Sequence, residues 1–245
     1  MTGLLSVTYR QLSPEEIIKL AVECGLECVE WGSDIHVPSG DTETAKRVAK
    51  LSADAGIKCP TYGSYYKIAV SEKDDFAKVV ECAKILGSKC IRVWAYDKKM
   101  CDASESELEN AVADAQRICD MASDFKICLE CHDGTLTDDY NDTLKFIKLV
   151  NRPNLRMFWQ PNQYKTEEYN LECAKALASY TENVHVFAWK VYDRFPLKDH
   201  EKIWRKYIEI LRSANNDMPF MLEFTPKNEP SEIYTETETL KEWLK

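Results

Sequence analysis

Four side chains that can bind a metal ion lie on or just after four consecutive apolar segments in the second half of the chain. The segments are 125–130, 155–159, 184–189 and 220–224, and the four residues are Glu130, Gln160, His185 and Glu223. Polar groups are costly to bury among parallel strands, so their position at the ends of these segments needs a reason. Oxygen and nitrogen ligands from four adjacent strands suit one divalent cation, with Mn²⁺ expected first and Mg²⁺, Co²⁺ or Zn²⁺ as alternatives.

These residue types also indicate a reaction. Two carboxylates at short range repel each other in a low-dielectric pocket, and a bound cation removes that penalty while polarising a carbonyl group. We expect Glu130 and Glu223 to be catalytic: one removes a proton from the carbon next to the carbonyl, and the other returns it on the opposite face. If a neighbouring hydroxyl group leaves instead, the same site is a dehydratase. The alternative without a metal is a Glu–Arg network that caps the core, with His185 as a core histidine.

Further polar side chains share one face of the expected strands with cysteines. Side chains alternate between the two faces of a strand, so each strand cysteine can be taken as a marker of the inward face. The inward set then comprises Glu30, Thr61, Arg92, Trp94, Glu130 and His132. Arg92 and His132 are candidates to bind substrate hydroxyl or carbonyl groups, and Glu30 to orient one of them. A salt bridge between Arg92 and Glu30 at the mouth of the fold is the alternative.

Aromatic residues near the strand ends are candidates for a wall on which a sugar stacks. They are Trp31, Tyr62, Tyr66, Trp94 and Trp189, and the alternative for each is a place in the core. His36, in the loop after the second strand, is expected to lean over the pocket. Arg194 follows the seventh strand and is expected to reach a substrate carboxylate or phosphate, the alternative being a solvated loop charge.

The elements that would position these residues follow a regular repeat. The phrases that end the first three expected helices are Gly25-Leu26-Glu27-Cys28, Gly56-Ile57-Lys58-Cys59 and Gly87-Ser88-Lys89-Cys90, with the glycines 31 residues apart. A repeat of this length holds one strand and one crossover helix. The repeat therefore predicts that the chain consists of consecutive βα units.

Eight strands alternate with eight helices along the sequence. The first four strands are expected over 4–8, over 28–31, from 57 onward and over 90–94, and the other four are the segments given above. Ser13 with Glu16 and Ser104 with Glu107 match the capping box that begins a helix. We predict an α/β fold, a single (βα)8 TIM barrel over residues 1–245. The alternative, an open doubly wound sheet, would normally show a glycine-rich phosphate loop after the first strand, and Tyr9-Arg10-Gln11 has none.

Composition restricts the classes of protein that this chain can be. Its 245 residues are 44% hydrophobic and 30% charged, as in an ordinary globular protein. The net charge is −9 and no stretch is strongly basic, which argues against binding nucleic acid. We find no membrane span and no export signal, so we expect a cytoplasmic enzyme with reduced cysteines and no membrane partner.

The chain resembles the xylose-isomerase-like barrel superfamily, in particular its sugar phosphate isomerase/epimerase branch. Relatives there include ketose 3-epimerases, hydroxypyruvate isomerases and inosose dehydratases. The phrases that carry the resemblance are Val29-Glu30-Trp31-Gly32 with His36-Val37-Pro38, Ile91-Arg92-Val93-Trp94, Leu129-Glu130-Cys131-His132, Val184-His185-Val186-Phe187 and Leu222-Glu223-Phe224. The resemblance implies a metal-assisted isomerase or epimerase of a carbohydrate, with the metal on Glu130, the position of Gln160, His185 and Glu223. It also makes a homodimer possible.

Residue 160 departs from the pattern of these relatives, which usually place an Asp there. The amide oxygen of Gln160 can still bind a hard cation but brings no charge, so we expect weaker metal binding. A dehydratase of the inosose type, or a non-catalytic carbohydrate-binding barrel with a degenerate metal site, therefore stays open. An apurinic-site endonuclease on the same fold would need a histidine-rich zinc cluster, and the chain has only four histidines.

Overall fold

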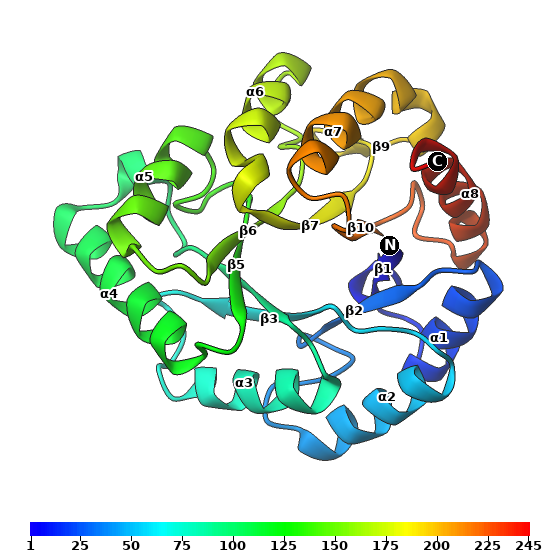
Figure 1. Ribbon diagram of the computed structural model, residues 1–245, viewed down its shortest axis with the longest axis horizontal. Helices are drawn as coiled ribbons and strands as arrows, with labels where there is room; N and C mark the ends of the chain where they lie inside the picture. The colour runs from blue at the N-terminus through cyan, green and yellow to red at the C-terminus, as the bar shows by residue number, and fades with distance from the viewer.

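Eight parallel strands close into a barrel in the computed structural model, which describes residues 1–245 (Figure 1). The barrel strands are β1 (Thr2–Leu5), β2 (Cys28–Gly32), β3 (Thr61–Lys67), β4 (Cys90–Trp94), β5 (Lys126–Glu130), β6 (Leu155–Trp159), β7 (Thr181–Val186) and β10 (Phe220–Leu222). Their order around the barrel is β1-β10-β7-β6-β5-β4-β3-β2, so the last strand pairs with the first. The predicted (βα)8 barrel is confirmed.

Eight helices form the outer ring that Figure 1 shows around the strands. They are α1 (Pro14–Glu23), α2 (Thr42–Asp54), α3 (Asp75–Leu86), α4 (Glu105–Met121), α5 (Tyr140–Val150), α6 (Glu167–Leu177), α7 (Glu201–Ala214) and α8 (Ile233–Trp243). Both capping boxes form as the sequence predicts, at Ser13 with Glu16 and at Ser104 with Glu107. None of these helices has the length and apolar character that crossing a membrane requires.

Three strands differ from the predicted ranges by three or more residues at one end, each for a local reason. The first ends at Leu5 because the chain turns into a 3-10 helix (Ser6–Tyr9), and the Oγ of Ser6 accepts the Gly32 amide in place of a backbone carbonyl. The third begins at Thr61 because Pro60 has no N–H to donate to a ladder.

The seventh strand ends at Val186 instead of continuing to residue 189. The chain beyond it forms an antiparallel hairpin of β8 (Trp189–Lys190) and β9 (Asp193–Arg194), which are joined in register as Trp189 with Arg194. This hairpin is not part of the barrel sheet. It follows the carboxyl end of β7, so Trp189 and Arg194 lie at the mouth of the barrel.

The interior of the barrel is divided into an apolar floor and a polar upper layer. The floor is a buried cluster of Leu5, Val7, Cys28, Cys90, Cys128, Phe158 and Met221. Because side chains two positions apart share a face, Glu30, Arg92 and Glu130 lie one layer above the three floor cysteines. The use of cysteines as inward markers therefore placed these three charged residues correctly, and all three are nearly inaccessible to solvent.

Replacement of a floor residue tests whether this apolar layer supports the barrel. Leu5→Ala should lower the free energy of unfolding by about 2–5 kcal/mol, because Leu5 is fully buried and its loss leaves a cavity. The matched change Leu149→Ala, at a residue 45% exposed on α5, should stay within about 0.5 kcal/mol of the parent. Urea unfolding followed by circular dichroism measures both, and equal effects would contradict this account of the floor.

Candidate metal and substrate site

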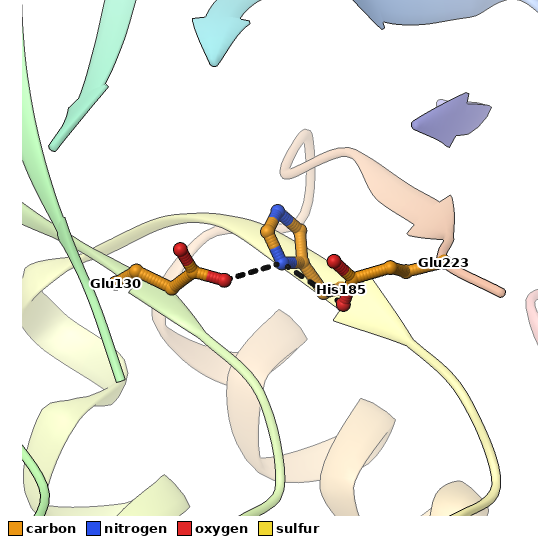
Figure 2. A group of neighbouring side chains, drawn as sticks. All are labelled: Glu130, His185 and Glu223. Atoms are coloured by element: carbon orange, nitrogen blue, oxygen red, sulfur yellow. Dashed lines mark ion pairs between the residues drawn. The ribbon is translucent and has the colours of Figure 1, made fainter. Parts of the chain in front are cut away.

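Glu130, His185 and Glu223 point toward one another in the upper layer of the barrel (Figure 2). Glu130 ends β5, His185 lies in β7 and Glu223 directly follows β10. One ligand atom from each lies within 4.8 Å of the others. The Nδ1 atom of His185 is 3.5 Å from Glu130 Oε1 and 3.5 Å from Glu223 Oε2.

Gln160 completes this group from the end of β6. Its Oε1 atom lies 2.8 Å from His185 Nδ1, on the side that also faces the two carboxylates. Four residues separated by up to 93 positions along the chain thus bring three oxygens and one nitrogen together. The four candidate metal ligands predicted from the sequence therefore meet at one place.

Arg92 holds two of the buried carboxylates in fixed positions. Its Nε donates to Glu30 Oε1 at 2.8 Å, and its Nη1 donates to Glu130 Oε2 at 2.5 Å. The indole N–H of Trp94 donates to the same Glu130 oxygen. Although burial alone would raise the pKa of Glu130, Arg92 and His185 lower it far below its usual range. Glu130 is therefore a fixed carboxylate with Oε1 directed at His185.

β3 approaches this ion network so closely that only a glycine fits at position 63. A Cβ atom on Gly63 would lie 2.6 Å from Glu30 Oε1 and 2.7 Å from Arg92 Nη2. Both distances are shorter than any ordinary contact, so a larger residue would displace the ion pair. The backbone of β3 is thus part of the wall that holds Arg92 in place.

Glu30 lies on the other side of His185 and completes its environment. His185 Nε2 is 3.9 Å from Glu30 Oε2, and both atoms are buried without a hydrogen-bond partner. A histidine that binds a metal through one nitrogen commonly directs its other N–H at a carboxylate, which fixes the ring and its tautomer. Glu30 is in the place of that carboxylate, and Nδ1 lies on the opposite side of the ring, where it contacts Gln160, Glu130 and Glu223.

The charges around His185 also favour a cation. Three carboxylates, Glu30, Glu130 and Glu223, surround it, and Arg92 is the one permanent positive charge in this layer. Burial alone would lower the pKa of His185, but Glu223, Glu130 and Glu30 raise it well above its usual value. The excess negative charge thus attracts either a proton or a divalent cation. The donor set and its electrostatics therefore fit a divalent metal ion.

A cavity of about 180 Å³ opens directly above these groups. Four of the predicted substrate-binding residues line it, namely Arg92, Trp94, His132 and Trp189. His132 stacks on Trp94 with ring centroids 4.7 Å apart. The cavity also has lining residues that the sequence analysis did not single out, among them Arg10, Tyr65, Gln163, Phe187 and Phe224.

Tyr62 and Tyr66 do not line this cavity, which corrects their prediction as substrate-binding residues. The Tyr62 hydroxyl donates to the Val37 carbonyl at 2.6 Å, and the Tyr66 hydroxyl donates to Asp114 at 3.1 Å, both outside the barrel. A bulge in β3 between Gly63 and Tyr66 shifts the register, and Tyr65, with φ of 54°, turns into the cavity instead. The sequence shows three tyrosines around Gly63-Ser64, but it does not show which of them faces the cavity, because the bulge depends on pairing with β4.

Two other candidates also lie outside the cavity. His36 is 4% exposed, has Nε2 3.1 Å from the Leu12 carbonyl and packs edge-on against the buried Trp31, so it is a structural residue. Glu30 lies beneath the cavity floor, where it contacts Arg92 and His185 and not a substrate. The alternative reading of Arg92 and Glu30 as a salt bridge is therefore the one that the structure gives.

Arg194 lies at the rim of the cavity, over two aromatic rings that line it. Its Cζ atom is 4.5 Å from the centre of the Trp189 ring and 4.6 Å from that of Phe224. A larger cleft of about 520 Å³ lies beside this rim, between α6 and α7. It shares Gln163, Phe187 and Trp189 with the cavity but contains none of the four ligand residues, so we place the site in the smaller cavity.

Comparison with known proteins agrees with the barrel fold. A family model described as "Xylose isomerase-like TIM barrel" matches residues 18–244. No curated protein sequence matches significantly. The probable 3-DHS dehydratase AsbF of Bacillus anthracis is 20% identical, with a TM-score of 0.82 over 98% of this chain and 99% of that one.

Two further solved structures contain metal ions. The IOLI protein with a bound zinc atom is 14% identical, with a TM-score of 0.74 over 99% of this chain and 95% of that one. A xylose isomerase-like TIM barrel protein from Mycobacterium smegmatis in complex with magnesium is 11% identical, with a TM-score of 0.73 over 100% and 97%. At such identities the likeness establishes the fold.

Replacement of Glu30 tests its role behind His185. Glu30→Gln should weaken Mn²⁺ binding by about 10- to 100-fold, because a neutral amide orients the imidazole less well than a carboxylate. Isothermal titration calorimetry of the metal-free protein measures this, with Glu209→Gln on the exposed face of α7 as the matched control. An unchanged Mn²⁺ affinity in a folded Glu30→Gln protein would show that Glu30 supports the barrel and not the metal site.

Proposed function

This chain belongs to the xylose isomerase-like TIM barrel family, and from that premise we propose that it is an enzyme that moves a proton at the carbon next to a carbonyl group of a carbohydrate. The observation that carries the proposal is the meeting of Glu130, Gln160, His185 and Glu223 beneath a cavity lined by aromatic residues. In our proposal the main outcome is isomerisation or epimerisation of a sugar, a sugar phosphate or a polyol-derived ketone.

These four residues would hold one divalent cation, with Mn²⁺ the first expectation and Mg²⁺, Co²⁺ or Zn²⁺ as alternatives. When bound, such an ion supplies a Lewis acid that polarises the carbonyl group and makes the neighbouring C–H more acidic. Gln160 brings an oxygen without charge, so the ligand set carries two negative charges from Glu130 and Glu223. A cation held by fewer charges binds less tightly but withdraws electrons more strongly from a substrate.

The two glutamates are not equivalent as carriers of protons. Glu130 accepts hydrogen bonds from Arg92 and Trp94 at Oε2 and directs Oε1 at the metal position, so neither oxygen is available to a substrate proton. Glu223 has one long contact, 3.5 Å from Oε2 to His185 Nδ1, and it lines the cavity. We therefore assign removal of the proton to Glu223 and give Glu130 a holding role, which revises the two-glutamate scheme expected from the sequence.

His132 supplies a second group that can accept a proton, and it favours dehydration as the second candidate function. Its Nδ1 lies 2.7 Å from the carbonyl oxygen of Asp133, which can only accept, so Nδ1 carries the hydrogen. In neutral His132 the lone pair is then on Nε2, and the ring lines the cavity. A proton taken there from carbon can be passed to a departing hydroxyl group, which would leave as water.

The walls of the cavity suit a carbohydrate. Trp94, Trp189, Phe187 and Phe224 line it, and aromatic faces pack against the C–H faces of sugar rings. Gln163 and Tyr65 add polar atoms for hydroxyl groups. A volume of about 180 Å³ fits a single monosaccharide-sized molecule rather than a polymer.

Hydrogen exchange tests the role of Glu223 as the residue that removes the proton. The Mn²⁺-loaded protein should exchange the C–H next to the carbonyl of a ketohexose, a pentulose or an inosose in D₂O, as followed by proton NMR. Glu223→Gln should slow this exchange at least about 100-fold, because the proton acceptor is lost. Glu168→Gln, at an exposed residue in α6, is the matched control.

Loss of water distinguishes the two candidate outcomes in the same samples. A dehydratase forms a conjugated carbonyl that absorbs in the ultraviolet, whereas an isomerase forms no such product. If the protein is a dehydratase, His132→Gln should abolish the ultraviolet signal. Sugar binding that survives a chelator, with no exchange by any probe, would contradict the enzyme proposal and indicate a binding barrel.

A further inference from the structure

The rim of the cavity carries hydrogen-bond donors that no group of the protein uses. The guanidinium of Arg194, on β9, makes no hydrogen bond and no ion pair with the protein, and it stacks on Trp189 and Phe224. The indole N–H of Trp189 is also buried without an acceptor. A guanidinium and an indole without acceptors indicate a ligand that supplies oxygen atoms with negative charge.

A second guanidinium faces the same rim and is already oriented. Arg10 lines the cavity, and its Nε and Nη2 donate to Asp34 Oδ2 at 3.0 and 2.7 Å. Its Cζ atom lies 6.0 Å from the centre of the Phe224 ring, the ring on which Arg194 also lies. Asp34 neutralises the charge of Arg10 and fixes its side chain. The only hydrogen bond from Arg10 Nη1 is a long one, 3.4 Å, to the Val7 carbonyl.

The backbone at Phe224 is built to present this ring. Phe224 has φ of 52°, an uncommon conformation for a residue with a side chain, and its N–H donates to Thr8 Oγ1 at 3.0 Å. Because Phe224 directly follows Glu223, this turn places the ring that carries both arginines beside the proposed base. Strained backbone of this kind persists where the surrounding structure holds it, often at binding sites.

Charge balance around the site leaves Arg194 in excess. With a divalent cation bound and His185 neutral, Arg92 and the cation together balance Glu30, Glu130 and Glu223. Asp34 balances Arg10. Arg194 then contributes an uncompensated positive charge at the rim, which a neutral sugar would not satisfy.

We propose that the substrate carries an oxyanion, a carboxylate or a phosphate, at the end remote from the reacting carbon, and that Arg194 with Arg10 binds this group at the rim. This inference rests on the proposed function, since it places the reacting carbon above Glu223. It makes Arg194 a residue that determines specificity and takes no part in proton transfer.

Matched ligand pairs test the inference by equilibrium binding. Gluconate and sorbitol differ by a carboxylate, and fructose 6-phosphate and fructose differ by a phosphate. Calorimetry with the Mn²⁺-loaded protein should show that at least one of the two anions binds about 10- to 100-fold more tightly than its neutral partner. Arg194→Gln should remove this preference, and Arg152→Gln, at an arginine paired with Asp120 in the exposed turn after α5, should retain it.

The outcomes are distinct. A preference for gluconate alone identifies a carboxylate, and one for fructose 6-phosphate alone identifies a phosphate. A preference that persists in Arg194→Gln would place the anion on the metal ion and overturn the inference, as would equal binding within both pairs. Failure to bind Mn²⁺ would overturn the proposed function instead, whatever the ligands do, and Arg194→Gln should bind Mn²⁺ with unchanged affinity.

Discussion

The buried ion network of Arg92 with Glu30 and Glu130 is the interaction on which the upper half of the barrel depends. All three side chains are almost completely inaccessible, so each charge must find its partner within the protein. Breaking such a buried pair by removing one partner costs about 3–5 kcal/mol, because the other charge stays buried alone. The network therefore requires a glycine at position 63, and it determines the direction of the Glu130 oxygen that Arg92 does not bind.

This network also explains how one site can hold several carboxylates close together. Arg92 takes one oxygen from Glu30 and one from Glu130, which leaves their other oxygens facing His185 from two sides. Glu223 is outside the network of Arg92, and its Oε2 lies 3.5 Å from His185 Nδ1. The site thus has one carboxylate, Glu130, that Arg92 holds in place, and one, Glu223, that Arg92 does not contact; in our proposal Glu223 is the residue that removes the proton. The mouth above them is built from loops and the β8–β9 hairpin.

The strand period was enough to predict much of this from the sequence. Cysteines two positions before Glu30, Arg92 and Glu130 identified the inward face, and polar residues at the ends of four later segments identified Gln160, His185 and Glu223. The sequence could not reveal that Tyr65 and not Tyr62 or Tyr66 faces the cavity, since that depends on a bulge created by pairing with β4. The sequence offered the Arg92–Glu30 salt bridge only as an alternative, and it did not indicate that Arg92 also pairs with Glu130, 38 residues away. Arg10 was missed because it follows a 3-10 turn that shortens the first strand.

The apolar floor and the internal countercharge of Arg92 have a consequence for how the protein acquires its ion. The barrel closes on Leu5, Phe158 and their neighbours, and Glu30 and Glu130 already have a permanent cationic partner. We therefore expect the chain to fold without a metal ion and to bind one afterwards. Which divalent ion these buried ligands would bind then depends on the free concentrations of the competing metals, with copper and zinc the strongest competitors.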